Sequence, residues 1–309
     1  MTVLVTGASG FIGQRITSQL DRTERSVCCV VRSGSNYSTG HKTVSLERID
    51  ALNETTGWSH CLRGVSSIVH CAAVAHGNPG DVWSVNVAGT LNLARQAADA
   101  GVKRFVFLSS IGVNGNTSTS PFDESDTPDP GGLYSQSKWE AEQGLWEVQR
   151  DTGMQVVILR PPLVYGPNAP GNFGSLVQWV DKGVPLPLGA IHNKRSLVAL
   201  DNLVDLILTC IDHPAAANQV FLAGDGQDVS TTELLRGVGQ AMGKPARLIP
   251  VPAAVLMFGA GVLGKKAVAQ RLLGSLQVDI SKARNLLGWE PPLSVEEGLR
   301  RCFVSENEC

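Results

Sequence analysis

Apolar runs of strand type alternate with segments of helical periodicity through the first half of the chain. A strand buried on both faces of a parallel sheet is continuously apolar, whereas an amphipathic helix repeats its apolar positions every three or four residues. Such alternation is typical of an α/β protein in which helices connect parallel strands. The strands are predicted at residues 2–5, 26–32, 67–73, 103–109 and 155–159.

A glycine turn directly follows the first predicted strand and precedes an amphipathic helix. Gly7 permits the tight turn, Gly10 lets the backbone approach a pyrophosphate, and Gly13 lets helix and strand pack closely. The N-terminus of the helix offers unpaired N–H groups and a partial positive charge to phosphates. The turn therefore predicts a dinucleotide site, and the fold class is a Rossmann-type, doubly wound parallel sheet.

The regular alternation ends near residue 165, where Pro, Gly and Asn cluster through Gly174. We expect residues 1–165 to form the dinucleotide-binding domain, with segments near residues 190–215 available to join it. Residues 166–309 are expected to form mainly a smaller α/β region that binds substrate. No internal repeat is evident.

The end of the second strand predicts which dinucleotide binds. An acid at this position accepts hydrogen bonds from the ribose of NAD, whereas an arginine accommodates the extra phosphate of NADP. The strand ends in Arg32 and Ser33, and residues 26–46 contain no acid, so NADP(H) is favoured while NAD(H) stays possible. A plain surface arginine is the alternative. Asp50, after the next strand, would contact the adenine or cap a turn.

Other predicted strand ends carry small or polar residues. Ala72 and Ala73 would let the cofactor backbone lie close to the sheet, and Ser110 could hydrogen-bond a substrate oxygen. Ser109 is expected to cap a turn instead. Asn86 is a poor helix former inside a helix predicted over residues 81–100, which suggests either a bond to a neighbouring loop or a functional role.

Tyr134 and Lys138 lie one turn apart on a predicted helix. An ammonium beside a phenol favours the phenolate, so Lys138 is expected to lower the pKa of Tyr134 from about 10 towards the working pH of an acid/base catalyst. The same spacing is common on solvated helix faces. It indicates a catalytic pair only in combination with the cofactor loop and the serine at the neighbouring strand end.

Composition limits the function classes. With 43% hydrophobic and 17% charged residues, the 309-residue chain is globular, and a net charge of −2 gives no reason to expect nucleic acid as a partner. Seven scattered cysteines without a CxxC pair predict reduced thiols in a cytoplasmic protein, and no metal site is predicted. Residues 2–5 do not begin a signal peptide. Residues 251–264 are too few to cross a membrane and predict a buried or interfacial helix.

Several motifs together resemble the extended short-chain dehydrogenase/reductases, and within them the nucleotide-sugar epimerase/dehydratase branch. The resemblance covers nearly the whole chain. It rests on TGxxGxxG at 6–13, NVxGT at 86–90, Ser110, YxxxK at 134–138, LRPPxVYGP at 159–167, RSLVxxD at 195–201, DxSKA at 279–283 and LGWxP at 287–291.

The resemblance implies roles for individual residues. Tyr134 would be the acid/base, Lys138 would lower its pKa and hold the nicotinamide ribose, and Ser110 would bond the reacting oxygen. The substrate, a UDP-sugar, would contact Ser110 and Tyr134, and also Asn172, Arg195 and Arg271, the two arginines through its diphosphate. The residues expected at the cofactor are Gly7, Ser9, Gly10, Phe11, Ile12, Gly13, Arg32, Ser33, Asp50, Ala72, Ala73, Asn86, Tyr134, Lys138, Pro161 and Val164.

The resemblance also limits the reaction. Sugar 4,6-dehydratases carry an acid pair where Ile111 and Gly112 follow Ser110, so dehydration is not expected. The favoured interpretation is an NADP-dependent reductase that acts at C4 of a UDP-4-keto-6-deoxy-N-acetylhexosamine in surface polysaccharide synthesis. The alternative is a UDP-hexose 4-epimerase, or, in another class, a non-catalytic dinucleotide-sensing protein. A homodimer formed through helices near residues 81–100 and 133–151 is expected.

Overall fold

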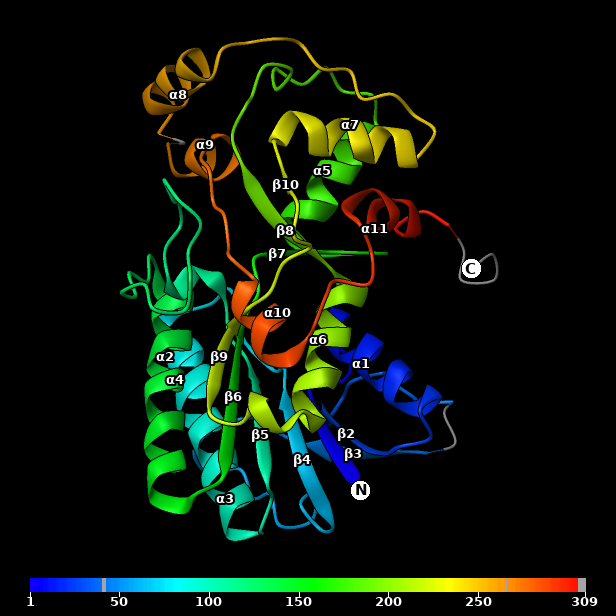
Figure 1. The fold of residues 1–309 in the computed structure, drawn as a ribbon, viewed down its shortest axis with the longest axis vertical. Helices are drawn as coiled ribbons and strands as arrows, with labels where there is room; N and C mark the ends of the chain where they lie inside the picture. Colours follow the sequence, from blue (N-terminus) through cyan, green and yellow to red (C-terminus); the bar gives the residue numbers. More distant parts are fainter. Residues whose placement is uncertain (41–42, 265, 305–309) are drawn as a thin grey trace.

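The computed structural model describes residues 1–40, 43–264 and 266–304, and its largest element is a seven-stranded parallel sheet (Figure 1). The strand order β3-β2-β1-β4-β5-β6-β9 confirms the predicted Rossmann-type fold. The strands are β1 (Thr2–Thr6), β2 (Ser26–Arg32), β3 (Val44–Ile49), β4 (Val65–His70), β5 (Arg104–Leu108), β6 (Gln155–Arg160) and β9 (Gln219–Leu222).

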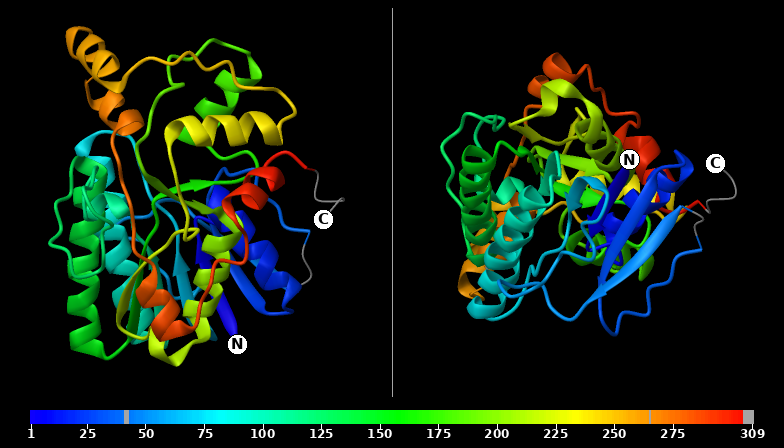
Figure 2. Two further views of the ribbon diagram at one scale, coloured as in Figure 1. Left: turned by 45° about the horizontal axis from the view of Figure 1, so that its top comes forward. Right: turned by 90° about the horizontal axis from the view of Figure 1, so that it is seen from below.

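Helices cover both faces of this sheet, as the continuously apolar strands require. On one face, α1 (Phe11–Arg22) and α6 (Leu200–Asp212) share a core with alternate side chains of β1. On the other face, α3 (Thr90–Asp99) and α4 (Leu133–Thr152) pack over the remaining side chains, and Figure 2 shows these layers from below.

A second sheet of three strands lies beyond the carboxyl ends of the parallel strands (Figure 1). A separate apolar core joins it to three helices. Its strands are β7 (Leu163–Tyr165), β8 (Arg195–Ala199) and β10 (Asp228–Val229), and the helices are α5 (Gly171–Asp181), α7 (Thr231–Ala241) and α11 (Val295–Arg301). After β8 the chain returns to the large sheet, where α6 packs and β9 pairs, before it enters the small unit again at β10. The domain boundary near residue 165 stays a prediction.

The helix predicted over residues 81–100 is interrupted. It consists of α2 (Pro79–Trp83), a π-helical segment η1 (Ser84–Gly89) and then α3. The buried side-chain amide of Asn86 lies in this wider turn and accepts a hydrogen bond from the Val74 N–H, outside its own helix. Single π-helical turns of this kind are frequent at functional sites. The dimer expected through this helix and α4 stays a prediction.

The remaining elements include short turns and the C-terminal helices. They are the 3-10 turns η2 (Ile111–Val113) and η3 (Pro214–Ala216), and the helices α8 (Ala253–Val262), α9 (Lys266–Leu273) and α10 (Ser281–Leu287). No helix among the described residues has both the length and the apolar character that a membrane span needs. Six cysteines within these ranges are free thiols, and Cys309 lies outside them.

A buried ion pair connects strand β6 to helix α4. Arg160 Nη2 lies 2.6 Å from Glu142 Oε2, and the two side chains are 4% and 0% exposed. Arg160 Nη1 donates to Asn114 Oδ1 at 3.0 Å, and the Ser109 hydroxyl donates to Glu142. Since each charge has its partner, the network fixes α4 against the carboxyl ends of two neighbouring strands.

Removing one member of this pair should be costly. Arg160→Met leaves the Glu142 carboxylate buried without its cation, so we expect about 3–5 kcal/mol less free energy of unfolding in urea titrations. The double variant Arg160→Met/Glu142→Leu should recover much of that loss. Arg300→Met, which breaks an exposed pair with Glu297, serves as a control and should change stability by less than about 1 kcal/mol. A loss of that small size in Arg160→Met would contradict a structural role for the pair.

Candidate active site

The glycine turn lies where the order of the parallel strands reverses. Strands β1 and β4 are neighbours there, and ligands of open α/β sheets bind at the carboxyl ends of such strands. Gly7 follows β1 with a φ of +67°, and a Cβ at Gly7 would lie only 2.8 Å from the Ala72 nitrogen after β4. The turn therefore has room for no side chain at Gly7.

The same turn packs closely against helix α1. A Cβ at Gly13 would lie 2.2 Å from the Gly7 carbonyl oxygen, to which the Gly10 N–H donates at 2.9 Å. Gly10 is the N-cap of α1 and supplies no side-chain cap, so the first N–H groups of the helix have no side-chain acceptor there. Ser9 is exposed, while Phe11 and Ile12 are half-buried. This cradle fits a pyrophosphate held by backbone N–H groups.

The residues predicted near the adenosine ribose lie at the ends of β2 and β3. Arg32, Ser33 and Asp50 are exposed, and the Ser33 N–H donates to the Ile49 carbonyl at 2.7 Å. The neighbouring Arg48 donates to the backbone carbonyls of Ser35 and Tyr37. Arg32 is thus an exposed cation at this edge, while the guanidinium of Arg48 is used to hold the following loop.

Lys138 is buried at the centre of the site. Its side chain is 1% exposed, and its ammonium donates to the Leu108 carbonyl of β5 at 2.8 Å. The Nζ atom lies 4.5 Å from the ring centroid of Phe107 and 5.9 Å from that of Tyr134. Burial lowers the pKa of Lys138 to about 8, although Cys71 and Glu142 act in the opposite direction.

The pKa of Tyr134 differs from the expectation. Burial raises it to about 12, and the predicted lowering by Lys138 is wrong for the protein alone. The ammonium of Lys138 is directed to the Leu108 carbonyl rather than to the phenol oxygen. Helical spacing placed the two residues on one face, but it could not show where the ammonium donates.

Ser110 lies beside the first turn of α4. Its hydroxyl accepts a hydrogen bond from the Gly112 N–H at 3.1 Å. A Cβ at Gly112 would lie 2.4 Å from Ser135 Oγ and 3.3 Å from Ser110 Oγ, so this turn and the start of α4 are in contact. The expectation that Ser109 caps the turn is wrong, because Ser110 does so and Ser109 bonds to Glu142.

Other predicted cofactor residues surround this centre. The Pro161 carbonyl accepts from the Ile111 N–H at 3.0 Å, and Val164 lies on the adjoining strand β7. Asn86 bonds both backbone groups of Val74, and its Nδ2 also donates to Ser137 Oγ on α4 at 2.9 Å. Asn86 therefore anchors the loop after β4 to the helix of Tyr134, and its cofactor contact stays a prediction, as does that of Ala73.

The two arginines predicted for the diphosphate lie together. Arg195 Nη1 donates to the carbonyls of Arg271 at 3.0 Å and of Gly274 at 3.2 Å. Burial lowers the pKa of Arg195, while Arg271 is exposed on α9. Asn172 is exposed in the first turn of α5. The contact between strand β8 and helix α9 could not be read from sequence spacing.

Sequence reasoning missed two features that support the site. Glu142 is four residues beyond Lys138 on the same face of α4, a spacing that would have identified it as a charged neighbour. The other is a tie between the loop before α4 and the segment after α9. The N–H groups of Ser118 and Phe122 donate to the carbonyls of Ser275 and Gln277, both at 2.9 Å.

The histidine at the end of β4 is structural. His70 Nδ1 and Nε2 lie 2.7 and 2.9 Å from the hydroxyls of Thr6 and Thr90, and burial lowers its pKa to about 3.

Among the described residues, Glu47, His60 and Cys61 are close enough to share a metal ion, and the sequence does not predict this group.

The raised pKa of Tyr134 can be tested by phenolate absorbance. Without cofactor, we expect no phenolate signal from Tyr134 below about pH 10, the ordinary tyrosine value. An oxidised nicotinamide carries a positive charge and should lower the pKa, so added cofactor should reveal a signal that Tyr134→Phe lacks. Tyr37→Phe, which removes one of the other two tyrosines, serves as the control. A Tyr134 phenolate below that pH in cofactor-free protein would contradict the assignment.

Comparison with known proteins agrees with this geometry. A model of the NAD dependent epimerase/dehydratase family matches residues 3–224. A UDP-glucose 4-epimerase of Vibrio cholerae is 44% identical, with 97% of this chain and 94% of that protein covered. An N-acetyl-alpha-D-glucosaminyl-diphospho-ditrans,octacis-undecaprenol 4-epimerase of Escherichia coli O157:H7 is 27% identical, with 98% and 95% covered.

Solved structures show the same fold. A UDP-glucose 4-epimerase of Thermotoga maritima has a TM-score of 0.78 at 24% identity, with 98% of this chain and 97% of that chain covered. A UDP-N-acetylglucosamine 4-epimerase of Bacillus cereus has a TM-score of 0.81 at 19% identity, with 98% of both covered. The family match over residues 3–224 and the 44% identical relative show that the chain belongs to the NAD dependent epimerase/dehydratase family.

Proposed function

We propose that this protein is a nucleotide-sugar 4-epimerase that inverts the C4 centre of a UDP-hexose. The observation that carries the proposal is the convergence of Tyr134, Lys138 and Ser110 beside the glycine cradle. A relative that is 44% identical over nearly the whole chain is a UDP-glucose 4-epimerase, which supports the same reaction.

The cradle of Gly7, Gly10 and Gly13 would hold the pyrophosphate of a nicotinamide dinucleotide, and Lys138 would hold its ribose. When bound, this cofactor supplies reversible hydride transfer at a sugar carbon. Tyr134 is half-buried beside the buried Lys138, and polar contacts are stronger in such a partly desolvated position than in water.

Tyr134 is the proton carrier in this proposal. Its phenolate takes the proton of the sugar hydroxyl and returns it after the sugar has turned over in the site. The hydroxyl of Ser110 donates a hydrogen bond to the same oxygen, and the ammonium of Lys138 stabilises the phenolate. Arg195 and Arg271 bind the diphosphate, which holds the sugar near Tyr134 while either face is presented.

An epimerase fits better than the ketoreductase that the sequence favoured. The relatives named above are 4-epimerases, and the reductase interpretation depended on a preference for NADPH. Dehydration is a poor fit because Ile111 and Gly112 offer no acid beside Ser110. The intact Tyr134 and Lys138 argue against a protein that only senses the cofactor.

We also propose NAD rather than NADP as the cofactor. The family is described as NAD dependent, and the comparisons do not support the NADP preference inferred from Arg32. A 2′-phosphate needs charge-assisted contacts, and the nearby guanidinium of Arg48 already holds two backbone carbonyls. Ser33 and Asp50 remain close to the ribose edge as neutral and acidic partners.

A second candidate substrate is a sugar whose diphosphate is linked to a lipid instead of to uridine. The Escherichia coli relative is named as a 4-epimerase of a sugar linked through a diphosphate to undecaprenol. The exposed apolar helix α8, which adjoins the helix that carries Arg271, favours this candidate. Assays with UDP-N-acetylglucosamine and with the polyprenyl-diphosphate-linked sugar separate the two.

Replacing Tyr134 should nearly abolish turnover. With a UDP-hexose, wild-type protein should invert the sugar without a net change in nicotinamide absorbance, and Tyr134→Phe should lower kcat by about 10²–10⁴-fold. Its affinity for the cofactor should stay within a few-fold of wild type, and Tyr37→Phe should be fully active. Consumption of reduced cofactor with a 4-keto sugar, and no inversion, would support the reductase instead.

The cofactor proposal predicts tighter binding of NAD⁺ than of NADP⁺. By isothermal titration we expect at least about a tenfold difference, equivalent to 1.4 kcal/mol. Arg32→Glu should weaken NADP⁺ binding further and change NAD⁺ binding by only a few-fold, because its charge opposes the additional phosphate. Arg22→Glu, on the exposed end of α1, controls for net charge. Tighter NADP⁺ binding by wild type would refute the proposal.

A further inference from the structure

Helix α8 exposes one apolar face, while Ala253 and Leu256 on its other face are half-buried against the core of the small sheet. Its ten residues are all Ala, Val, Leu, Met, Phe or Gly, and none of them is buried. Val255, Phe258 and Val262 are 58%, 77% and 74% exposed, and Leu263 after the helix is 72% exposed. A globular protein normally buries such a helix, so α8 is an apolar surface that calls for a partner.

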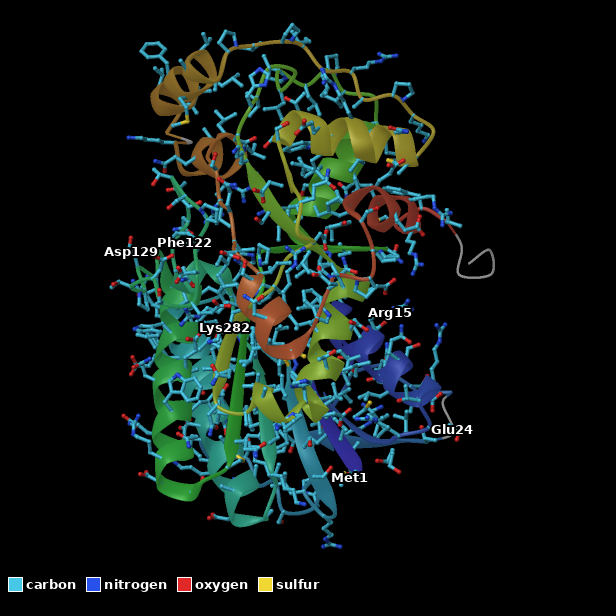
Figure 3. The ribbon with its side chains drawn as sticks, in the orientation of Figure 1. Met1, Arg15, Glu24, Phe122, Asp129 and Lys282 are labelled. Carbon is cyan, nitrogen blue, oxygen red and sulfur yellow. The ribbon has the colours of Figure 1, made fainter. Side chains whose placement is uncertain are left out.

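The position of α8 leaves it accessible. Figures 1 and 2 show α8 at an outer end of the molecule, beyond the small sheet and beside α9, and its side chains extend outward in Figure 3. Its first residues, with Ala190, Ile191 and Leu273, line a cavity of about 570 Å³ at the base of the helix. The cavity also includes Leu273 and Ser275, on either side of the Gly274 carbonyl to which Arg195 donates, so the base of α8 lies near that arginine.

The charged residues in the sequence segment that contains α8 all have one sign. Between Glu233 and Asp279 the sequence contains no Asp or Glu, although the whole chain has more acids than bases. The bases in this segment are Arg236, Lys244, Lys265, Arg247, Lys266 and Arg271. Lys266 and Arg271 are exposed on α9, next to the apolar helix, whereas Lys244 pairs with Asp181. Apolar side chains beside uncompensated bases are typical of an element that binds an anionic lipid surface.

We propose that α8 and α9 dock the protein onto an anionic phospholipid bilayer, with α8 inserted into one leaflet. Ten helical residues extend about 15 Å, half of the roughly 30 Å hydrocarbon core, so α8 can enter a leaflet but cannot cross. Lys266, at the start of α9, then lies at the level of the phosphate headgroups. Docking holds the diphosphate-binding end of the site at the lipid surface.

A second copy of the chain is a poorer occupant of this surface. In a two-fold dimer through α8, the same patch faces itself, so Lys266 and Arg271 of one subunit would approach those of its partner. Like charges at such an interface are repulsive, and no acid in the segment compensates them. An anionic bilayer satisfies both the apolar and the basic residues.

Flotation with lipid vesicles tests this proposal, and it needs neither sugar nor cofactor, so failure here is separate from failure of the proposed reaction. Wild-type protein should float with vesicles of phosphatidylcholine and phosphatidylglycerol, and at least about tenfold less with phosphatidylcholine alone. Phe258→Glu/Val262→Glu should lose at least about tenfold in binding, because charges would enter the hydrocarbon. Lys266→Ala should lose about fivefold.

Matched controls keep the result interpretable. Leu286→Glu, at a 39% exposed leucine on α10, adds a charge elsewhere and should bind vesicles like wild type. Phe258→Trp places an additional tryptophan on α8. Vesicles with brominated acyl chains should quench the fluorescence that this tryptophan adds to that of the native tryptophans. Absence of vesicle binding by folded wild-type protein overturns the proposal. So does a dimer that Phe258→Glu/Val262→Glu converts to monomer while vesicle binding stays unchanged.

Discussion

A buried lysine ammonium is the interaction on which the rest of the site depends. The ammonium of Lys138 is buried, and it is stabilised there by a hydrogen bond to the Leu108 carbonyl and by the ring of Phe107. That bond sets the distance between β5 and α4. The turn after β5, which carries Ser110, and the first turn of α4, which carries Tyr134, are therefore held in register.

Support for this lysine extends through the core in two directions. Glu142, one turn further along α4, pairs with Arg160 and so fixes the helix to β6. Asn86 ties the other side of α4 to the loop after β4, close to the glycine cradle. Hydrogen bonds and an ion pair thus connect the candidate acid/base residues to the glycine cradle, and the proposed reaction needs such fixed positions for sugar and dinucleotide.

The C-terminal half carries the candidate substrate residues and the exposed apolar face of α8. Arg195 on β8 donates to backbone carbonyls of α9, so the two candidate diphosphate ligands belong to one local structure. The same segment is preceded by α8, whose exposed face, with Val255, Phe258 and Val262, has no core to pack against within the described chain. In the two proposals, the helices α8 and α9 therefore serve both membrane docking and binding of the substrate diphosphate.

The sequence alone determined the parallel sheet, the glycine cradle and the identity of Ser110, Tyr134 and Lys138, because these depend on local periodicity and on fixed spacing between neighbouring residues. It gave the wrong role to Ser109 and the wrong direction for the pKa of Tyr134, since hydrogen-bond partners and desolvation arise from segments far apart in the chain. Only the tertiary structure paired Arg195 with α9 and left one face of α8 exposed, because burial of an apolar face depends on whether another surface packs against it.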